Sequence, residues 1–242
     1  MPGYYPIMLD IRHKVAIVIG GNQLAAEKVA GLVACGAQVR VLSPTFCYTL
    51  LLLAQQHTIT LCHKSYQKGD LAGAFIVIVA TSDPQLAEAV ASEAQEHGQP
   101  INVVDMPRHC SFILPSILRR GQLTIAVSTE GASPGLAKRI RQQLAKLFSP
   151  AYEPYLRLAS AARTRLRANN VSYKLRDDFF GDYFASEVLA RLEVGDITTA
   201  AAVTQALLQP YGVETKASAL EKEAYNNETE EWSGLSGWGG AG

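Results

Sequence analysis

The sequence lacks an excess of charge of either sign, a long apolar run and a signal-peptide pattern. Lysine plus arginine equals aspartate plus glutamate at 22 residues each, so net charge favours neither nucleic acid nor an anionic membrane as partner. No apolar run approaches the roughly 18 residues that a membrane-spanning helix requires. The first residues, MPGYYPIMLDIRHK, do not have the arrangement of a signal peptide. We therefore expect a cytoplasmic protein with no nucleic acid and no membrane among its partners.

The sequence also lacks a pattern for metal ligation or for a disulfide framework. The four cysteines are Cys35, Cys47, Cys62 and Cys110, and no two of them form a CxxC pair. The five histidines are isolated, without the spacing of metal ligands. These absences predict reduced thiols and no resident metal, with Cys110 packed rather than reactive.

Up to Asp105, short β-branched runs alternate with apolar residues at helical spacing. Strands are expected over residues 15–19, 39–42, 59–62, 75–80 and 101–105, and helices over residues 24–34, 46–56 and 84–97. This alternation predicts an α/β fold with a Rossmann-like, doubly wound parallel sheet. The ligand of such a sheet lies beyond the carboxyl ends of its strands.

The pattern changes after Pro107. The expected elements are a hairpin with strands 112–118 and 123–128 around a turn at 119–122, a helix over 135–148, and a helical region to about residue 210. Ser133 and Pro134 predict the start of the helix, because a hydroxyl caps free amides and proline suits the first turn. The last residues are polar and then glycine-rich, which is typical of disorder.

The run VAIVIGGNQLAAEK, residues 15–28, begins as a buried strand and continues as a helix, with glycines at the joint. Gly20 allows a tight bend, Gly21 allows close approach of a ligand, and free amides at the helix start attract phosphate. Asn22 replaces the second glycine of the G-x-G-x-x-G fingerprint, and we expect it to be tolerated because asparagine adopts left-handed backbone angles readily. Ser43 stands where an acidic residue would bind a ribose. By itself, the turn is equally consistent with a nucleotide site and with an ordinary strand-to-helix connection.

Two further segments carry candidate chemistry. Asp105 ends the fifth expected strand, where a carboxylate can act as an acid, a base or a metal-loading group. The alternative role for Asp105 is to cap the turn that follows it. The run STEGASPGLAKR, residues 128–139, places hydroxyls and glycine before a helix start, which predicts a second anion site or capping alone.

In this order, these segments resemble the precorrin-2 dehydrogenases, a family that includes bifunctional dehydrogenase/ferrochelatases and the N-terminal module of siroheme synthase. The matching runs are YYPIMLDIRHKVAIVIGG (4–21), AAEKVAGLVACGAQVRVLSP (25–44), GAFIVIVATSDP (73–84) and INVVDMPRHCSFILPSILRRGQLTIAVSTEGASPGLAKRIR (101–141). The succession of NVVD, FILP and STEGASP is specific to the family, whereas the glycine turn is not.

The resemblance implies NAD-dependent oxidation of precorrin-2 to sirohydrochlorin, and in some members insertion of Fe²⁺ or Co²⁺ as a second substrate. It implies that Asp105 is the catalytic proton acceptor in either step. The implied cofactor contacts are Gly20, Gly21, Asn22, Gln23, Leu24, Ser43, Pro44, Thr45, Thr81, Ser82 and Asp83. The substrate contacts that we expect are Ser128, Thr129, Arg119, Arg120, Lys138 and Arg139, because the tetrapyrrole carries many carboxylates.

The resemblance also implies a homodimer, formed by the apolar hairpin and helix that follow the sheet. We divide the chain into an NAD-binding Rossmann-like domain (1–112), a dimerisation region (113–150), a helical domain (151–212) and a disordered tail (213–242). Two alternative functions stay open. One is a non-catalytic NAD(H)-sensing module, and the other is a tetrapyrrole carrier that ignores NAD⁺.

Overall fold

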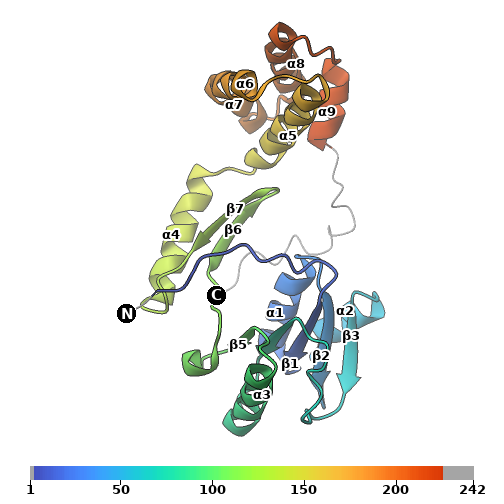
Figure 1. Ribbon diagram of the computed structural model, residues 1–242, viewed down its shortest axis with the longest axis vertical. Helices are drawn as coiled ribbons and strands as arrows, with labels where there is room; N and C mark the ends of the chain where they lie inside the picture. Colours follow the sequence, from blue (N-terminus) through green and yellow to red (C-terminus); the bar gives the residue numbers. More distant parts are fainter. Residues whose placement is uncertain (1–2, 226–242) are drawn as a thin grey trace. The chain divides into compact units, whose positions relative to one another are not determined.

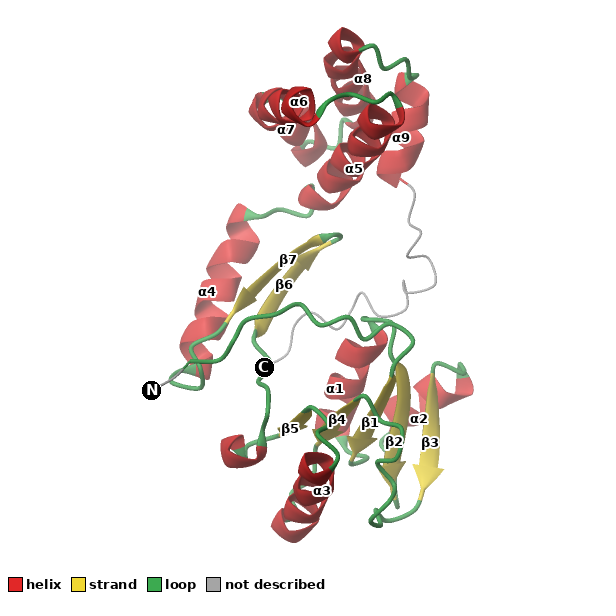
Figure 2. Cartoon of the chain, viewed as in Figure 1, coloured by secondary structure: helices red, strands yellow, loops and turns green. Residues whose placement is uncertain are grey.

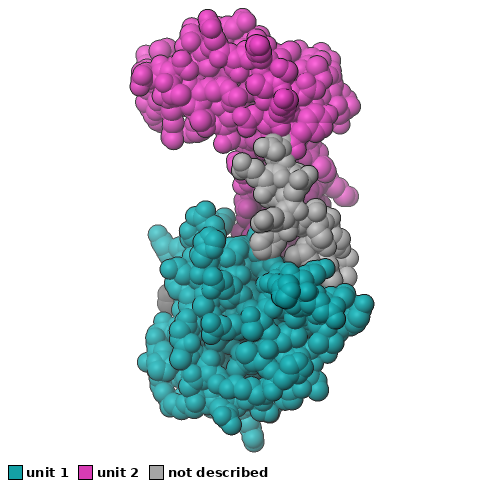
Figure 3. All heavy atoms as spheres, turned by 90° about the vertical axis from the view of Figure 1, so that its right-hand side faces the viewer, with its two compact units in different colours: residues 1–114, 232–242 teal, residues 115–231 magenta. Residues whose placement is uncertain are grey.

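The computed structural model describes residues 3–225. This part of the chain forms two compact units, which meet in the sequence at Leu114 and Pro115 (Figure 3). The change of unit therefore falls close to the predicted boundary after residue 112. No helix in residues 3–225 combines the length and the apolarity that crossing a membrane would need.

The first unit is built on a five-stranded parallel sheet in the order β3-β2-β1-β4-β5 (Figures 1 and 2). Its strands are β1 (Val15–Ile19), β2 (Gln38–Ser43), β3 (Ile59–His63), β4 (Ile76–Val79) and β5 (Ile101–Val103). Its helices are α1 (Gln23–Val33), α2 (Tyr48–Gln55) and α3 (Pro84–Glu96), and a short 3-10 helix, η1 (Pro107–His109), follows β5. The predicted Rossmann-like α/β fold is confirmed.

Side chains of the central strand alternate between two apolar layers. Ala16 and Val18 of β1 pack with α1 and α2 on one face of the sheet. Ile17 and Ile19 pack with α3 on the other face. All four are at most 2% exposed, which explains why this strand reads as a continuous apolar run. The two layers fix the sheet and therefore the positions of the loops at its carboxyl edge.

The second unit begins with an antiparallel hairpin of β6 (Ser116–Arg120) and β7 (Leu123–Val127), against which α4 (Pro134–Leu147) packs. The predicted first strand began too early, because Phe112 packs against the α1 layer of the first unit. The predicted turn was too long, because Arg119 and Arg120 pair with β7. Gly121, with φ of +55°, supplies the left-handed residue that a two-residue turn needs.

The remaining helices form one apolar cluster. They are α5 (Tyr152–Ala168), α6 (Tyr173–Ala185), α7 (Val188–Glu193), α8 (Ile197–Leu208), the 3-10 helix η2 (Gln209–Tyr211) and α9 (Ala217–Tyr225). Phe179 and Tyr183 are fully buried at its centre, and the Tyr183 hydroxyl donates to the carbonyl oxygen of Tyr155 at 2.8 Å. The predicted helical region is therefore present, and the hydroxyl of its buried Tyr183 is hydrogen-bonded.

The expectation of disorder from residue 213 was wrong for α9. Leu220 and Ala224, four residues apart, are buried in the helical cluster. The Arg157 guanidinium donates to the Ala224 carbonyl oxygen at 3.0 Å, and Arg165 lies 3.3 Å from the Glu223 carboxylate. The polar composition of this segment obscured a short apolar stripe. Residues 226–242, the rest of the predicted tail, lie outside the described residues.

Candidate functional site

The glycine turn after β1 is crowded by the loop after β4. Gly20 has φ of +128°, a backbone conformation that side chains with a Cβ rarely adopt. A Cβ at Gly20 would lie 2.3 Å from the Ala80 carbonyl oxygen. The Gly20 amide donates to the Leu42 carbonyl oxygen at 3.0 Å, which joins the turn to the end of β2 as well.

Gly21 is required for a reason that differs from the expectation. A Cβ at Gly21 would lie 1.8 Å from the Thr45 carbonyl oxygen and 2.7 Å from Ser43 Oγ. The Gly21 carbonyl oxygen also accepts from the Cys47 amide at 2.7 Å. The loop after β2 therefore closes directly onto the glycine turn, so the predicted loops after β1, β2 and β4 do meet at one edge of the sheet.

Asn22 caps helix α1. Its Oδ1 accepts from the Ala25 amide at 2.9 Å, and its backbone is extended, with φ of −87° and ψ of −178°. The expectation of a left-handed asparagine was therefore wrong. The amides of Gln23 and Leu24 have no acceptor among residues 3–225, which leaves two donors at the positive end of α1 for an anion.

The other predicted cofactor contacts divide into two groups. Thr81 and Asp83 shape their own loop: Thr81 Oγ1 accepts from the Asp83 amide at 3.2 Å, and Asp83 caps α3 by accepting from the Gln85 amide at 2.9 Å. The solvent-exposed members of the set are Pro44, Thr45, Ser82 and Asp83. No carboxylate follows β2 here, because Ser43 ends the strand.

Asp105 lies in the turn that follows β5. The Met106 amide donates to the Val103 carbonyl oxygen at 3.2 Å, and Asp105, with φ of +60°, occupies the third position of that turn. Turns with a left-handed residue at this position favour glycine or asparagine. Within residues 3–225 the exposed Asp105 carboxylate has no hydrogen bond and no ion pair. It therefore does not cap the turn, and the alternative structural role has no support.

The sheet topology places Asp105 near the reversal of strand order. From β1 the chain continues to β2 and β3 on one side, and then returns to β4 and β5 on the other. In open sheets of this kind, ligands bind where the order reverses, here between the ends of β1 and β4. Asp105 follows β5, the strand paired with β4. His109 is the last residue of η1, and its Nε2 accepts from Arg108 Nε at 3.0 Å.

The predicted hydroxyl contacts, Ser128 and Thr129, lie in the second unit before α4. Ser128 Oγ accepts from the Glu130 amide at 3.0 Å, and Thr129 Oγ1 accepts from the Ser133 amide at 3.0 Å. Ser133 caps α4 by accepting from the Leu136 amide at 3.3 Å, as predicted. In the described part of the chain, neither Ser128 nor Thr129 donates to a protein acceptor, so both protons remain for a ligand.

The predicted cations differ in what they contact. Arg120 donates to the Phe148 carbonyl oxygen at 3.0 Å, at the end of α4, so its guanidinium stabilises the helix terminus. Lys138 and Arg139 form no ion pair or hydrogen bond with any described residue, and Arg139 is exposed. Arg119 is exposed on β6. Lys138 and Arg139 can therefore pair with an anionic ligand, whereas Arg120 stabilises the end of α4.

Sequence reasoning missed Glu93 of α3, a fully buried carboxylate. It accepts from the Tyr66 hydroxyl, from the Gly69 amide at 2.9 Å and from the Leu71 amide at 3.1 Å. Burial raises the pKa of Glu93, but these hydrogen bonds together lower it by more than burial raises it. The pKa of Glu93 therefore lies below its usual value. The sequence did carry a sign of this burial, because Glu93 lies three residues after Val90 and therefore on the apolar face of α3. Glu93 ties the segment between β3 and β4 to this helix.

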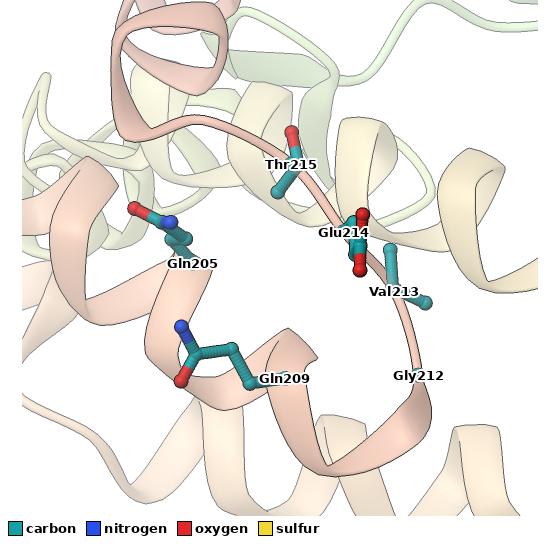
Figure 4. Close-up of a pocket in the computed structure, with 6 residues that line it drawn as sticks. All are labelled: Gln205, Gln209, Gly212, Val213, Glu214 and Thr215. Carbon is teal, nitrogen blue, oxygen red and sulfur yellow. The ribbon is translucent and has the colours of Figure 1, made fainter.

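The second unit contains a groove of about 370 Å³ beside α8 (Figure 4). It is lined by Gln205, Gln209, Gly212, Val213, Glu214 and Thr215. Gln205 Oε1 accepts from the Ala217 amide at 3.1 Å, so this side chain helps to begin α9. The groove includes none of the predicted site residues.

The first unit has a crowded glycine turn, two amides without an acceptor among the described residues at the start of α1, and a carboxylate after β5 at the same edge of the sheet. These features are those of a dinucleotide-binding type of α/β domain. Two family models match the chain in succession. Residues 7–116 match a family described as NAD(P)-binding, and residues 120–147 match the central part of sirohaem biosynthesis proteins. The predicted cofactor, NAD, agrees with the first match.

Siroheme synthases are similar to this chain over most of its length. The protein of Nitrosococcus oceani is 34% identical over 206 residues, 85% of this chain and 44% of that protein. The protein of Methylococcus capsulatus is 37% identical over 164 residues, 68% of this chain and 35% of that protein. The chain therefore spans less than half the length of these relatives. It is similar to part of the siroheme synthases, as the resemblance predicted.

A solved structure, SirC, precorrin-2 dehydrogenase, has the same fold. The TM-score is 0.71 at 24% sequence identity, and the likeness covers 86% of this chain and 99% of that one. The match includes both the parallel sheet and the region after it, because it extends over most of the chain. The fold inferred from the sequence is confirmed by this comparison.

Proposed function

We propose that this protein catalyses the NAD-dependent oxidation of precorrin-2 to sirohydrochlorin in sirohaem biosynthesis. The observation that carries the proposal is the Asp105 carboxylate, exposed and unpaired in the described structure, held in a left-handed turn beside the reversal of the sheet. Similarity to the siroheme synthases and the shared fold of a precorrin-2 dehydrogenase support this choice of reaction. The alternatives, an NAD(H) sensor and a tetrapyrrole carrier, do not account for an exposed carboxylate without a partner at this edge of the sheet.

The residues at the carboxyl edge fit a dinucleotide. The amides of Gln23 and Leu24 would hold the pyrophosphate at the start of α1, while Ser43 to Thr45 and Thr81 to Asp83 would border the riboses. When bound, NAD⁺ supplies the hydride acceptor. The closed packing of Gly20 and Gly21 on the neighbouring loops fixes these donors before any ligand arrives.

Asp105 accepts the proton that leaves the substrate as the hydride is removed. A solvent-exposed carboxylate with no partner among the described residues has free lone pairs for this proton. The substrate's carboxylates would be bound by Lys138, Arg139 and Arg119, and the Ser128 and Thr129 hydroxyls would donate to the same ligand. Arg120 contributes by holding the end of α4.

A second step on the same carboxylate is part of the proposal: insertion of Fe²⁺ or Co²⁺ into sirohydrochlorin. Pyrrole protons must leave as the metal enters, and Asp105 is the group that would accept them. Within residues 3–225, no three histidine, cysteine, aspartate or glutamate side chains gather as a metal site. The metal would thus be held chiefly by the nitrogens of the macrocycle as a substrate.

We also propose a homodimer formed through the hairpin and α4. Ile117, Leu136 and Leu147 of this region are 40%, 50% and 70% exposed, a large apolar surface for one helix on two strands. Sedimentation of the intact chain at micromolar concentration should give a dimer, and a monomer alone would contradict this part of the proposal. The proposed location is the cytoplasm, which cell fractionation can test.

The deciding experiment follows the visible spectrum of precorrin-2 supplied with NAD⁺ or NADP⁺, and then with Fe²⁺ or Co²⁺. Asp105→Asn should reduce the oxidation, because it removes the charge and keeps the shape of the side chain. Asp177→Asn is the matched control, since Asp177 is an exposed carboxylate on α6. An Asp105→Asn variant with full rates in both steps would remove the basis of the proposed function.

A further inference from the structure

The segment after η1 runs back along the open edge of β5, the last strand of the sheet. Ser111 pairs with Ile101, since its amide donates to the Ile101 carbonyl oxygen at 2.9 Å and its Oγ accepts from the Ile101 amide at 2.8 Å. The Asn102 Nδ2 donates to the Phe112 carbonyl oxygen at 3.0 Å. Side chains thus take the place of a sixth strand and protect the edge.

Cys110 makes the contact nearest to the Asp105 turn. Its Sγ accepts from the Val103 amide at 3.2 Å. The same sulfur lies 3.2 Å from the Val103 carbonyl oxygen and 3.5 Å from the Met106 carbonyl oxygen, and its single proton serves one of them at a time. Val103 and Met106 are the two ends of the turn that contains Asp105. The thiol therefore bridges both ends of that turn.

A left-handed conformation costs an ordinary residue about 1–2 kcal/mol and persists only when its surroundings enforce it. Asp105 is exposed and its side chain makes no bond that would enforce the conformation. The enforcing contacts must then act on the backbone of the turn. They are the amides of Val104, Met106 and His109, which donate to the carbonyl oxygens of Val79, Val103 and Met106, and the Cys110 thiol. Of these, only the thiol belongs to a side chain and is open to substitution.

We propose that Cys110 is a positioning residue for the catalytic step: its thiol ties Val103 to Met106 and thereby holds the Asp105 carboxylate where it takes the proton. This inference rests on the proposed function, because it needs Asp105 as the proton acceptor. A cysteine that only fills space in the apolar layer would have a different role, and Cys62 provides the comparison. Cys62 packs against the same apolar layer as Cys110, yet its thiol has no hydrogen bond among the described residues.

The test compares Cys110→Val, which removes the donor and acceptor at similar volume, with Cys110→Ser, which retains both, and with Cys62→Val as the matched control. For precorrin-2 oxidation, Cys110→Val should lower kcat by roughly tenfold or more, because small misplacement of a reacting group is costly. The KM for NAD⁺ should stay within about twofold, Cys110→Ser should recover most of kcat, and Cys62→Val should match wild type. Amide exchange at Met106 should accelerate in Cys110→Val alone.

A Cys110→Val enzyme with wild-type kcat, or a Cys62→Val enzyme with an equal loss, would overturn the positioning role. Unchanged exchange at the Met106 amide in Cys110→Val would overturn it as well, and this readout does not depend on any reaction. Failure of the proposed function has a separate signature, since Asp105→Asn would then retain full activity. The two failures can thus be distinguished from each other.

Discussion

Replacing Asp105 by glycine should make the protein more stable and inactive at once. The residue has φ of +60° in a turn position that favours glycine, and its exposed carboxylate has no partner within residues 3–225. The left-handed conformation costs about 1–2 kcal/mol for a residue with a Cβ. Glycine has no such cost but loses about 0.5–1 kcal/mol more in conformational entropy on folding.

Aspartate is at the low end of this cost because its short side chain tolerates the conformation, so the difference leaves a net gain of up to about 1 kcal/mol in the free energy of unfolding for Asp105→Gly. A change of 1 kcal/mol corresponds to roughly 2–4 °C in Tm for a chain of this size. Asp105→Asn should leave stability within about 0.5 kcal/mol of wild type, because asparagine adopts left-handed angles as readily. Both variants should lose precorrin-2 oxidation, since neither has a carboxylate.

Stability is measured by thermal or urea unfolding followed by circular dichroism, and oxidation by the visible spectrum of the tetrapyrrole. Asp177→Gly is the control for glycine itself: Asp177 lies inside α6, so this variant should be a few tenths of a kcal/mol less stable. A loss of stability in Asp105→Gly would show that the carboxylate supports the fold. Full oxidation by either Asp105 variant would show that it does not carry the chemistry.

Three further predictions concern the first unit. Gly21→Ala should lower the free energy of unfolding by about 1–3 kcal/mol and abolish NAD⁺ binding in calorimetry, because its Cβ would lie 1.8 Å from the Thr45 carbonyl oxygen. Gly31→Ala is the control and should be tolerated, because a Cβ at residue 31 would meet nothing within 4 Å. Asn22→Ala should lower stability by about 1 kcal/mol through loss of the α1 cap, and Asn22→Gly by only a few tenths of that, in urea unfolding. Because the pKa of Glu93 is lowered on folding, its carboxylate stabilises the protein above about pH 4.3, and this contribution is lost as the pH falls through the lowered pKa. Glu93→Gln should therefore be less stable at neutral pH and lose less stability on acidification; an unchanged acid dependence would refute that account.

The sheet was predictable because its signal is local. The strand Val15–Ile19 has the predicted bounds, because a short apolar run rich in β-branched residues is typical of a strand buried on both faces. The hairpin turn was misplaced for the opposite reason. Arg119 and Arg120 have the polarity of a turn, but exposed strand positions are polar too, and only Gly121 marks the bend.

The site was predictable as a set of loops but not as a set of contacts. The rule that ligands bind at the carboxyl edge selected the correct loops, and these do meet at Gly20 and Gly21. The cap made by Asn22 and the burial of Glu93 depend on what each side chain meets in space, which periodicity does not encode. The same holds for Arg120, whose charge suggested a ligand and whose guanidinium meets a helix end.

Gly21 and Asp105 are opposite cases at one edge of the sheet. Packing alone accounts for glycine at residue 21, because the Thr45 carbonyl oxygen leaves no room for a Cβ. Packing and backbone angle would both accept glycine at residue 105, yet an aspartate without a partner in the described structure stands there. The fold therefore explains the first residue and not the second. What the fold leaves unexplained at residue 105 is the carboxylate, and proton transfer from a substrate is the task that requires one.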